Sequence, residues 1–325
     1  MIFLTGGTGL LGLHILDELR SRNRSVRALA RTETAAEMLR RHGAGTLIGT
    51  VEAPDTWARV EDCEAIIHSA AVISTRGGWD RYRQVNVEGT RLAAARAREL
   101  GVPLLHVSSV AVYGRQKGRP LPITEDAAFG ELPENNFYAR SKRLAEEAVW
   151  EEAARGLDAT AFRPCVIYGE GDRLFLPRVA RALRHGWAPV VGHGTRPLTL
   201  VHARNVAVGI VAALDRPAAR GRSYNLTNDG EVTARLFVEA LGRGIGRKIR
   251  VVPVPEPAAF ALARVVDSLA GRMLRRRYPG SLRSAVGFWR GGNPYTSARA
   301  VEQLDWRPVV DHREGLERAG RLLGE

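Results

Sequence analysis

The first twenty residues constrain the fold more than any other stretch of the chain. They begin with an apolar run at residues 2–4, continue through a turn dense in glycine, and end in an amphipathic segment over residues 10–20. A short apolar run of this kind predicts a buried parallel strand, and the amphipathic segment predicts a helix. The glycines fit G-x-G-x-x-G as Gly7, Gly9 and Gly12, and the looser G-x-x-G-x-x-G as Gly6, Gly9 and Gly12.

Each glycine has a physical function in a turn between a strand and a helix. The first glycine allows the tight turn, Gly9 lets the backbone approach a pyrophosphate, and Gly12 lets the helix pack closely on the strand. Backbone amides at the helix start, aligned with the helix dipole, then hold the phosphates. The glycine motif alone also fits an ordinary tight turn, but the strand before it and the helix after it favour a nucleotide-cofactor site. The residues predicted to bind the cofactor here are Gly6, Thr8, Gly9, Leu10, Leu11 and Gly12.

The end of the second predicted strand, residues 25–30, bears on the choice of cofactor. A dinucleotide-binding fold that prefers NAD places an acidic residue near this point, where it binds the ribose 2′-hydroxyl. This chain has Ala30 and then Arg31, with no acid. An arginine suits a 2′-phosphate, so the sequence predicts that Arg31 binds NADP, with NAD as the alternative. The simpler interpretation of Arg31 is a solvated surface side chain in an arginine-rich protein.

Strands and helices alternate along the first half of the chain. Further strands are expected at 46–48, 65–71 and 103–109, and helices at 33–41, at 79–100 and from about 136 onward. The alternation predicts an α/β fold with a Rossmann-type doubly wound parallel sheet. We expect a dinucleotide-binding domain over 1–167, with 198–226 returning to it, and a smaller, discontinuous substrate-binding part formed by 168–197 and 227–325.

Candidate catalytic residues follow the glycine turn in a specific order. Ser108 and Ser109 end one predicted strand, and Tyr138 and Lys142 lie one turn apart on the next helix. A phenol with its ordinary pKa near ~10 exchanges protons poorly at neutral pH, and a nearby ammonium lowers that pKa. A tyrosine and a lysine at this spacing are common by themselves, but this ordered combination is not.

These segments together resemble the extended branch of the short-chain dehydrogenase/reductase superfamily. The similarity is to its NAD-dependent epimerase/dehydratase-like group, and in particular to the 3-beta-hydroxysteroid dehydrogenase/dihydroflavonol reductase-like branch. The matching residues are 5–12, 68–71, 86–90, 108–114, 138–142 and 163–169, with weaker matches at 200–207 and 304–308. The resemblance implies that Ser109, four residues before Tyr113, is the catalytic serine. It also implies that Tyr138 is the acid/base and that Lys142 binds the nicotinamide ribose. The further cofactor-binding residues are Ala70, Ala71, Asn86 and Pro164.

Three positions depart from the pattern of that group. Thr50 replaces an acidic residue often found near the adenine, and Arg204 replaces an aspartate beside Asn205. Leu198 stands where nucleotide-sugar members commonly have an arginine, although Arg196 is near. The last departure weakens the case for a nucleotide-sugar substrate, because its diphosphate would need a fork-shaped donor.

The resemblance and the residues together predict an NADP-dependent oxidoreductase that interconverts a secondary alcohol and a ketone. Tyr138 would exchange the hydroxyl proton and Ser109 would hydrogen-bond the substrate oxygen. One alternative is a nucleotide-sugar epimerase or dehydratase that retains NAD. Another is a non-catalytic cofactor-sensing protein, although such relatives typically lack the tyrosine–lysine pair that is intact here. The scattered histidines show no metal-ligand spacing, so we expect no metal.

Composition sets the expectations about partners and location. The chain carries 48 basic and 35 acidic residues, a net charge of +13. No zinc-finger, helix-turn-helix or basic–aromatic pattern accompanies that charge, so no nucleic-acid partner is expected and the partner is a small-molecule substrate. No apolar run reaches ~18 residues, which favours a cytoplasmic protein without a spanning helix. The helices at 79–100 and 137–154, with the small residues 93–95, suggest a homodimer.

A basic amphipathic segment lies at 258–277. The residues on its apolar side are Leu262, Val265, Val266, Leu269 and Met273, and those on the other side include Arg264, Asp267, Ser268, Arg272 and Arg275. The simplest expectation is a helix whose apolar side packs on the substrate-binding part. Alternatively, that side lines an apolar pocket or rests on an anionic membrane surface. Either alternative implies a largely hydrophobic substrate, such as a sterol-like, 3-oxoacyl or aromatic ketone.

Overall fold

The computed structural model describes residues 1–73, 77–116, 118, 120–227, 230–273 and 282–324, with the backbone alone for 270–273. The chain forms two compact units. Unit 1 comprises 1–167, 203–227 and 295–309, and unit 2 comprises 168–202, 228–294 and 310–325. Residues 295–309 thus lie in unit 1, whereas the division made from the sequence placed them in the substrate-binding part.

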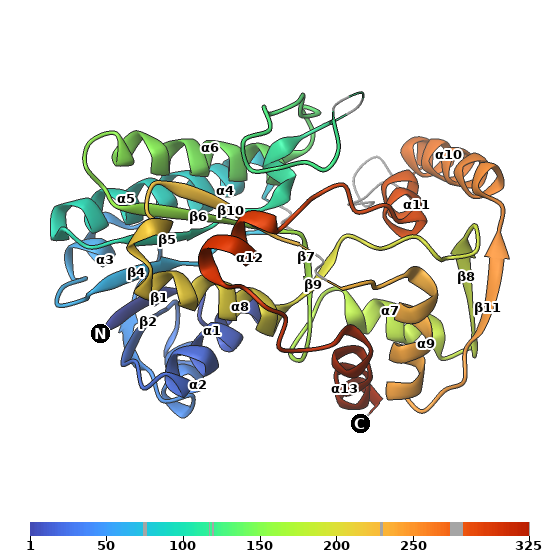
Figure 1. The fold of residues 1–325 in the computed structure, drawn as a ribbon, viewed down its shortest axis with the longest axis horizontal. Helices are drawn as coiled ribbons and strands as arrows, with labels where there is room; N and C mark the ends of the chain where they lie inside the picture. The colour runs from blue at the N-terminus through green and yellow to red at the C-terminus, as the bar shows by residue number, and fades with distance from the viewer. Residues whose placement is uncertain (74–76, 117, 119, 228–229, 274–281, 325) are drawn as a thin grey trace. The chain divides into compact units, whose positions relative to one another are not determined.

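Seven parallel strands form the sheet of unit 1 (Figure 1). In spatial order they are β10 (Arg222–Leu226), β6 (Ala159–Pro164), β5 (Leu104–Val107), β4 (Ala65–His68), β1 (Ile2–Thr5), β2 (Val26–Ala30) and β3 (Gly45–Ile48). Every neighbouring pair runs parallel, with Leu4 of β1 opposite Ala28 on one side and Ile67 on the other. The chain adds β2 and β3 on one side of β1, and then β4, β5, β6 and β10 on the other side. This reversal beside β1 confirms the Rossmann-type doubly wound fold.

Helices cover both faces of this sheet (Figure 1). One face carries α1 (Leu10–Ser21), α2 (Glu33–Arg41) and α8 (Ala203–Ala212), and the other carries α3 (Pro54–Ala58), α4 (Gly78–Tyr82), α5 (Gly89–Leu100) and α6 (Phe137–Ala153). The single helix expected at 79–100 is instead α4, a π-helical segment (Arg83–Glu88) and α5. Unit 1 also contains α12 (Ala298–Leu304) and three 3₁₀ segments, Val110–Tyr113, Ala213–Asp215 and Pro217–Ala219.

Two strands end earlier than the sequence predicts. β4 stops at His68 and β5 stops at Val107, so residues 69–71 and 108–109 are loop rather than strand. Small and hydroxyl-bearing residues at these points have weak strand propensity and can bond their own backbone instead. The candidate site residues in these segments therefore stand at the carboxyl edge of the sheet, where ligands of doubly wound folds bind.

The core beneath α5 and α6 explains the small residues of α5. Ala93 and Ala94 are fully buried and pack in one cluster with Phe3, Ile66 and Leu104 of three neighbouring strands. Small side chains let α5 approach the sheet closely, and the helix also packs along α6. The prediction of a homodimer rested partly on these alanines, but their side chains are buried in the core of this chain. Homodimerisation stays a prediction.

Unit 2 is built around a two-stranded parallel sheet and five helices. The strands are β8 (Trp187–Val191) and β11 (Arg250–Val254), and the helices are α7 (Leu176–Leu183), α9 (Ala234–Gly244), α10 (Glu256–Met273), α11 (Leu282–Arg290) and α13 (His312–Gly324). A further short strand of unit 2 is β9 (Leu200–His202), whereas β7 (Val166–Tyr168) contains the point at which the chain passes from unit 1 into unit 2. The rings of Phe175, Phe237, Phe288 and Trp289 form its aromatic core, with centroid separations of 5.3 Å for Phe237–Trp289 and 5.9 Å for Phe175–Phe288. Helices α9 and α13 pack side by side.

Helix α10 packs in the opposite way from the simplest expectation. Its buried residues are the small Ala259 and Ala263, whereas Leu262, Val265 and Leu269 are 62%, 56% and 51% exposed. The expectation that this apolar side packs inward is therefore wrong for these three residues. Val266, also predicted on the apolar side, is half-buried, and the side chains of Arg272, Met273 and Arg275 lie outside the described part of the chain. In the described residues no helix combines the length and apolar character that crossing a membrane requires.

Candidate active site

The glycine turn between β1 and α1 uses the G-x-x-G-x-x-G spacing. Gly6 has a φ of +74°, and a Cβ there would stand 2.7 Å from the backbone nitrogen of Ala70. A Cβ on Gly12 would stand 2.1 Å from the carbonyl oxygen of Gly6. Both positions therefore require glycine, for the left-handed turn and for close packing respectively. Gly9 is exposed and its Cβ would meet only one atom, Gly6 O, at 3.2 Å.

The start of α1 fits the pyrophosphate of a dinucleotide. Gly9 is its N-cap residue, with an extended backbone and no side-chain cap, and the first turn carries no acidic residue. The first-turn amides, those of Leu10, Leu11 and Gly12, have no acceptor within the helix and lie at the positive end of its dipole. Thr8 is half-buried just before them. A glycine-bounded, uncapped helix start is what a phosphate needs.

Arg31 stands immediately after β2, at the same edge of the sheet as the glycine turn. Its side chain is exposed, and it makes no hydrogen bond or ion pair with any residue that the structure describes. The next residue, Thr32, caps α2 by accepting a hydrogen bond from the backbone nitrogen of Ala35 at 3.2 Å. The guanidinium of Arg31 is therefore uncommitted and fits a 2′-phosphate.

A buried polar chain holds the loop that follows β4. Ala70 and Ala71 are half-buried, and Ala70 N donates to Thr5 Oγ1 at 3.2 Å. Thr5 Oγ1 lies 2.9 Å from His68 Nδ1, and His68 Nε2 lies 3.1 Å from Thr90 Oγ1. Burial lowers the pKa of His68 to about 3, so this ring is neutral. Thr5 and Thr90 both lie in segments that match the family, but their contacts with His68 could not be predicted because the partners are far apart along the chain.

Asn86 reaches the site indirectly. It is fully buried in the π-helical segment, and its side-chain amide donates to Val72 O at 3.0 Å and to Ser141 Oγ at 2.9 Å. Its side-chain oxygen accepts from Val72 N at 2.7 Å. Both donors of the amide are therefore used within the protein. These bonds tie the β4 loop to α6, and the cofactor contact expected for Asn86 stays a prediction.

Tyr138 and Ser109 are brought together from α6 and from the end of β5. Tyr138 lies in the first turn of α6, which Asn136 caps through a hydrogen bond from Ala139 N at 3.3 Å. Ser109 is the N-cap residue of the 3₁₀ segment after β5 and accepts from Ala111 N at 3.2 Å. Burial raises the pKa of Tyr138, and a side-chain hydrogen bond with Ser109 partly opposes that shift. The expected lowering of this pKa by Lys142 is not found.

Lys142 explains that difference. Its side chain is only 3% exposed, and its ammonium donates to the carbonyl oxygen of Val107 at 2.5 Å. Burial lowers the pKa of Lys142 to about 8, while the Glu146 carboxylate opposes the shift. The same ammonium, together with burial, lowers the pKa of His106. The ammonium of Lys142 thus interacts with the end of β5 and does not lower the pKa of the Tyr138 phenol.

The neighbouring serines have different partners. Ser108 is buried and donates to Glu146 Oε2 at 2.5 Å, and the other carboxylate oxygen pairs with Arg163 Nη2 at 2.5 Å. Ser108 is therefore part of a buried ion-pair network, whereas Ser109 is half-buried beside Tyr138. Pro164, a cofactor-binding residue that the resemblance implies, is buried at the end of β6 directly after Arg163.

The positions that depart from the family pattern have structural partners. Arg204 Nη2 pairs with Glu18 Oε2 of α1 at 2.7 Å, so it joins α8 to α1. Leu198 is fully buried in the core of unit 2. Arg196 Nη1 pairs with Glu256 Oε2 at 3.2 Å. Neither position in unit 2 offers a free cation to a diphosphate.

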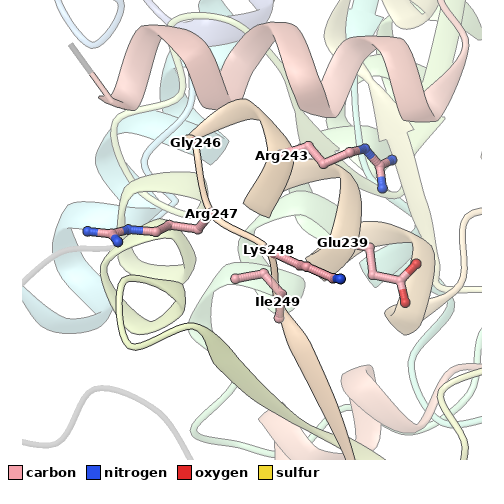
Figure 2. A pocket seen from close by; sticks show the side chains of 6 residues that line it. All are labelled: Glu239, Arg243, Gly246, Arg247, Lys248 and Ile249. Atoms are coloured by element: carbon pink, nitrogen blue, oxygen red, sulfur yellow. The ribbon is translucent and has the colours of Figure 1, made fainter.

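A hollow in unit 2 carries several charges but does not form a recognisable site (Figure 2). It measures about 540 Å³ and is lined by Glu239, Arg243, Gly246, Arg247, Lys248 and Ile249. The side chains of Arg243 and Arg247 point in opposite directions, and Arg243 pairs with Glu317 at 2.7 Å. None of the predicted site residues lines it. Within the described ranges, no group of three or more His, Cys, Asp or Glu side chains could hold a metal ion.

Comparisons with known proteins agree with this geometry. The model of the NAD dependent epimerase/dehydratase family matches residues 2–227. The 4-hydroxy-2-methyl-3-oxo-4-farnesyl-3,4-dihydroquinoline-1-oxide ketoreductase of Stigmatella aurantiaca is 32% identical over 319 residues, 97% of this chain and 94% of the relative. The 2-alkyl-3-oxoalkanoate reductase of Stenotrophomonas maltophilia is 26% identical over 326 residues, 98% and 97% of the two chains. The solved UDP-glucose 4-epimerase of Thermotoga maritima shares the fold, with a TM-score of 0.75 and 19% identity over 98% of this chain and 97% of that one.

The fold and the glycine turn define an enzyme of the extended short-chain dehydrogenase/reductase class. The chain belongs to the NAD-dependent epimerase/dehydratase family, and it is an NAD(P)-dependent oxidoreductase. The resemblance drawn from the sequence motifs is confirmed.

Proposed function

We propose that this enzyme uses NADPH to reduce a ketone to a secondary alcohol on a predominantly apolar small molecule. The observation that carries the proposal is the hydrogen-bonded pair of Ser109 and Tyr138 at the carboxyl edge of the sheet. Burial raises the pKa of Tyr138, so its phenol is protonated at neutral pH. A protonated phenol is a proton donor, and that is what reduction of a carbonyl requires.

Three side chains divide the work of the reaction. The nicotinamide, when bound, supplies the hydride that the carbonyl carbon accepts. Tyr138 donates its phenolic proton to the carbonyl oxygen, so that the ketone becomes an alcohol. Ser109 donates a hydrogen bond to the same oxygen and orients it toward Tyr138. Lys142, whose ammonium donates to Val107 O, would bind the nicotinamide ribose at the end of β5.

One feature supports NADPH over NADH. Gly6, Gly9 and Gly12 form a cradle that fits the pyrophosphate of either cofactor. Arg31 distinguishes the two, because its guanidinium is exposed, uncommitted and located where the 2′-substituent of the adenine ribose lies in this fold. A charge-assisted, fork-shaped contact with a 2′-phosphate would favour NADPH.

The names of two relatives support an apolar ketone substrate. Both names specify a 3-oxo compound, which carries a farnesyl group in one case and an alkyl group in the other. Leu198 is uncharged and Arg196 is paired with Glu256, so neither position supplies the free cation that a nucleotide-sugar diphosphate would need. Both observations favour an apolar carbonyl compound over a sugar nucleotide.

A substrate panel tests the proposal directly. Purified enzyme would be incubated with NADPH and 3-oxoacyl, sterol-like or aromatic ketones, and with UDP- and dTDP-sugars, while NADPH absorbance is followed. We expect NADPH consumption with at least one apolar ketone class, and its loss in Tyr138→Phe. Activity confined to the sugar nucleotides, or release of stoichiometric NAD when the untreated enzyme is denatured, would establish the epimerase alternative instead.

A further inference from the structure

The exposed side of α10 is an apolar surface that nothing in the described structure covers. Leu262, Val265 and Leu269 are spaced three and four residues apart, so their side chains share one side of the helix. We call these three residues the outer face of α10. Each is more than half exposed, whereas large aliphatic side chains are usually buried. A contiguous exposed apolar stripe of this kind marks an interaction site.

Packing fixes which side of α10 faces outward. Ala259 and Ala263 are buried, and their small size allows close contact. Helix α11 packs against α10, and Asp267 of α10 accepts hydrogen bonds from Leu282 N at 2.7 Å and Arg283 N at 3.2 Å. Rotating the outer face inward would break these bonds and would bring Ala259 and Ala263 into water. The exposure of the outer face therefore belongs to the folded unit.

The segment that contains the outer face is basic. From Glu256 to Arg290 the sequence has seven arginines, two acidic residues and no lysine. Both acids are engaged: Glu256 pairs with Arg196 and Arg290, and Asp267 caps α11. Arg264, on the polar side of α10, is exposed. The sequence of this segment therefore combines an apolar stripe with an excess of positive charge.

We propose that the outer face of α10 docks on an anionic lipid bilayer. Its aliphatic side chains enter the boundary between headgroups and acyl chains, while arginines contact the lipid phosphates, as in other interfacial amphipathic helices. A second copy of the chain is a poorer partner, because a symmetric contact would bring two arginine-rich segments of the same sign together. The proposal stands apart from the proposed catalytic function and uses none of the catalytic residues.

Co-sedimentation with vesicles tests the proposal. The full chain would be mixed with vesicles of phosphatidylcholine alone, or of phosphatidylcholine with phosphatidylglycerol, at low and high salt. We expect binding to the anionic vesicles that weakens at high salt. The double variant Leu262→Gln/Leu269→Gln should lower the partition coefficient by about tenfold or more, because burial of two leucines in the lipid is lost. Glutamine keeps helix propensity close to that of leucine, so the variant should fold.

A matched control and a charge variant complete the design. Leu322 of α13 is 55% exposed in the same unit, so Leu322→Gln makes the same chemical change away from α10 and should bind vesicles as the unmodified protein does. Arg264→Gln should reduce binding at low salt by roughly fivefold and have little effect at high salt.

Several outcomes would overturn the proposal. Failure of the unmodified protein to bind anionic vesicles would do so, as would equal binding by the Leu262→Gln/Leu269→Gln variant. If the unmodified protein were a dimer in light scattering and this variant a monomer, the outer face would be a self-association surface. None of these measurements depends on turnover, so a failure here is distinct from a failure of the proposed ketone reduction.

Discussion

Helices α6 and α10 both invert the usual distribution of polar and apolar side chains, but in opposite directions. Helix α6 buries four polar side chains, Ser141, Lys142, Glu146 and Glu152, and leaves Leu144 exposed. Helix α10 buries alanines and exposes Leu262 and its neighbours. Each departure costs free energy relative to the ordinary arrangement, so each indicates a place where something besides stability determines the sequence.

The two helices differ in how that cost is offset. Every buried polar side chain of α6 has a partner within unit 1. Lys142 donates to Val107 O, Ser141 accepts from Asn86, and the two glutamates, Glu146 and Glu152, pair with Arg163 and Arg98. The exposed aliphatic groups of α10 have no such compensation in the described structure. Buried polar groups that are paired within the protein are typical of a preorganised catalytic site. Exposed aliphatic groups that no other part of the protein covers are typical of a surface that meets a partner.

The largest expected effect concerns the phenol of α6. Tyr138→Phe removes the proton donor and should reduce turnover by about 10²–10⁴-fold, the usual contribution of a general acid or base. Cofactor affinity should survive, because the phenol is not part of the glycine cradle. Steady-state turnover and fluorescence titration with NADPH would measure the two effects separately. Near-normal turnover would remove Tyr138 from the mechanism and leave α6 as an ordinary structural helix.

The adjacent serines offer a sharper test of the same region. Ser109→Ala removes a hydrogen bond to the reacting oxygen and should lower turnover by about 10²-fold with little change in stability. Ser108→Ala instead removes the hydroxyl donor of a buried Glu146 oxygen, which keeps only Arg163 Nε at 3.1 Å, and should lower the free energy of unfolding by about 1–3 kcal/mol. Turnover of the folded Ser108→Ala protein should change little. The reverse pattern in turnover assays and urea unfolding would mean that the two serines exchange roles.

The third effect concerns the cofactor edge of unit 1. NADPH should bind more tightly than NADH by roughly 10–100-fold, the value of one charge-assisted contact to a phosphate. Arg31→Asp should erase or reverse that preference, since a carboxylate repels the 2′-phosphate and accepts a hydrogen bond from a 2′-hydroxyl. Fluorescence titration of both cofactors measures it, and equal affinities in the unmodified protein would contradict the role of Arg31.

Sequence patterns predicted unit 1 well because its function depends on short-range geometry. The glycine spacing, the strand–helix alternation and the tyrosine–lysine pair are all local, so the Rossmann-type fold and the family could be predicted from them. Other contacts could not be predicted, because they join residues far apart in sequence. These are the bond of Asn86 to Ser141 and the bonds that link Thr5, His68 and Thr90. The direction of the Tyr138 pKa was missed for the same reason, since burial is a property of the folded environment.

The sequence was less informative for α10. The helical period identified an amphipathic helix, and the helix is present. Periodicity shows that one side is apolar, but it does not show what covers that side. The small residues Ala259 and Ala263 also lie on one side, and in the folded unit they form the packed side in place of the leucines. Two sides of the helix could serve as the contact, and only the tertiary structure distinguishes them.

The smallest expected effect tests that distinction. Leu262→Ala should change the free energy of unfolding by no more than about 0.5 kcal/mol, because an exposed leucine loses few contacts. Ala263→Leu should destabilise the protein by about 1–3 kcal/mol, because extra methylene groups must enter a packed contact. This is the reverse of the usual order for a leucine and an alanine in one amphipathic helix. Urea unfolding of both variants, followed by circular dichroism, measures the difference. If Leu262→Ala instead cost about 2–5 kcal/mol, the outer face would be packed in the free protein, and α10 would be an ordinary core helix rather than a contact surface.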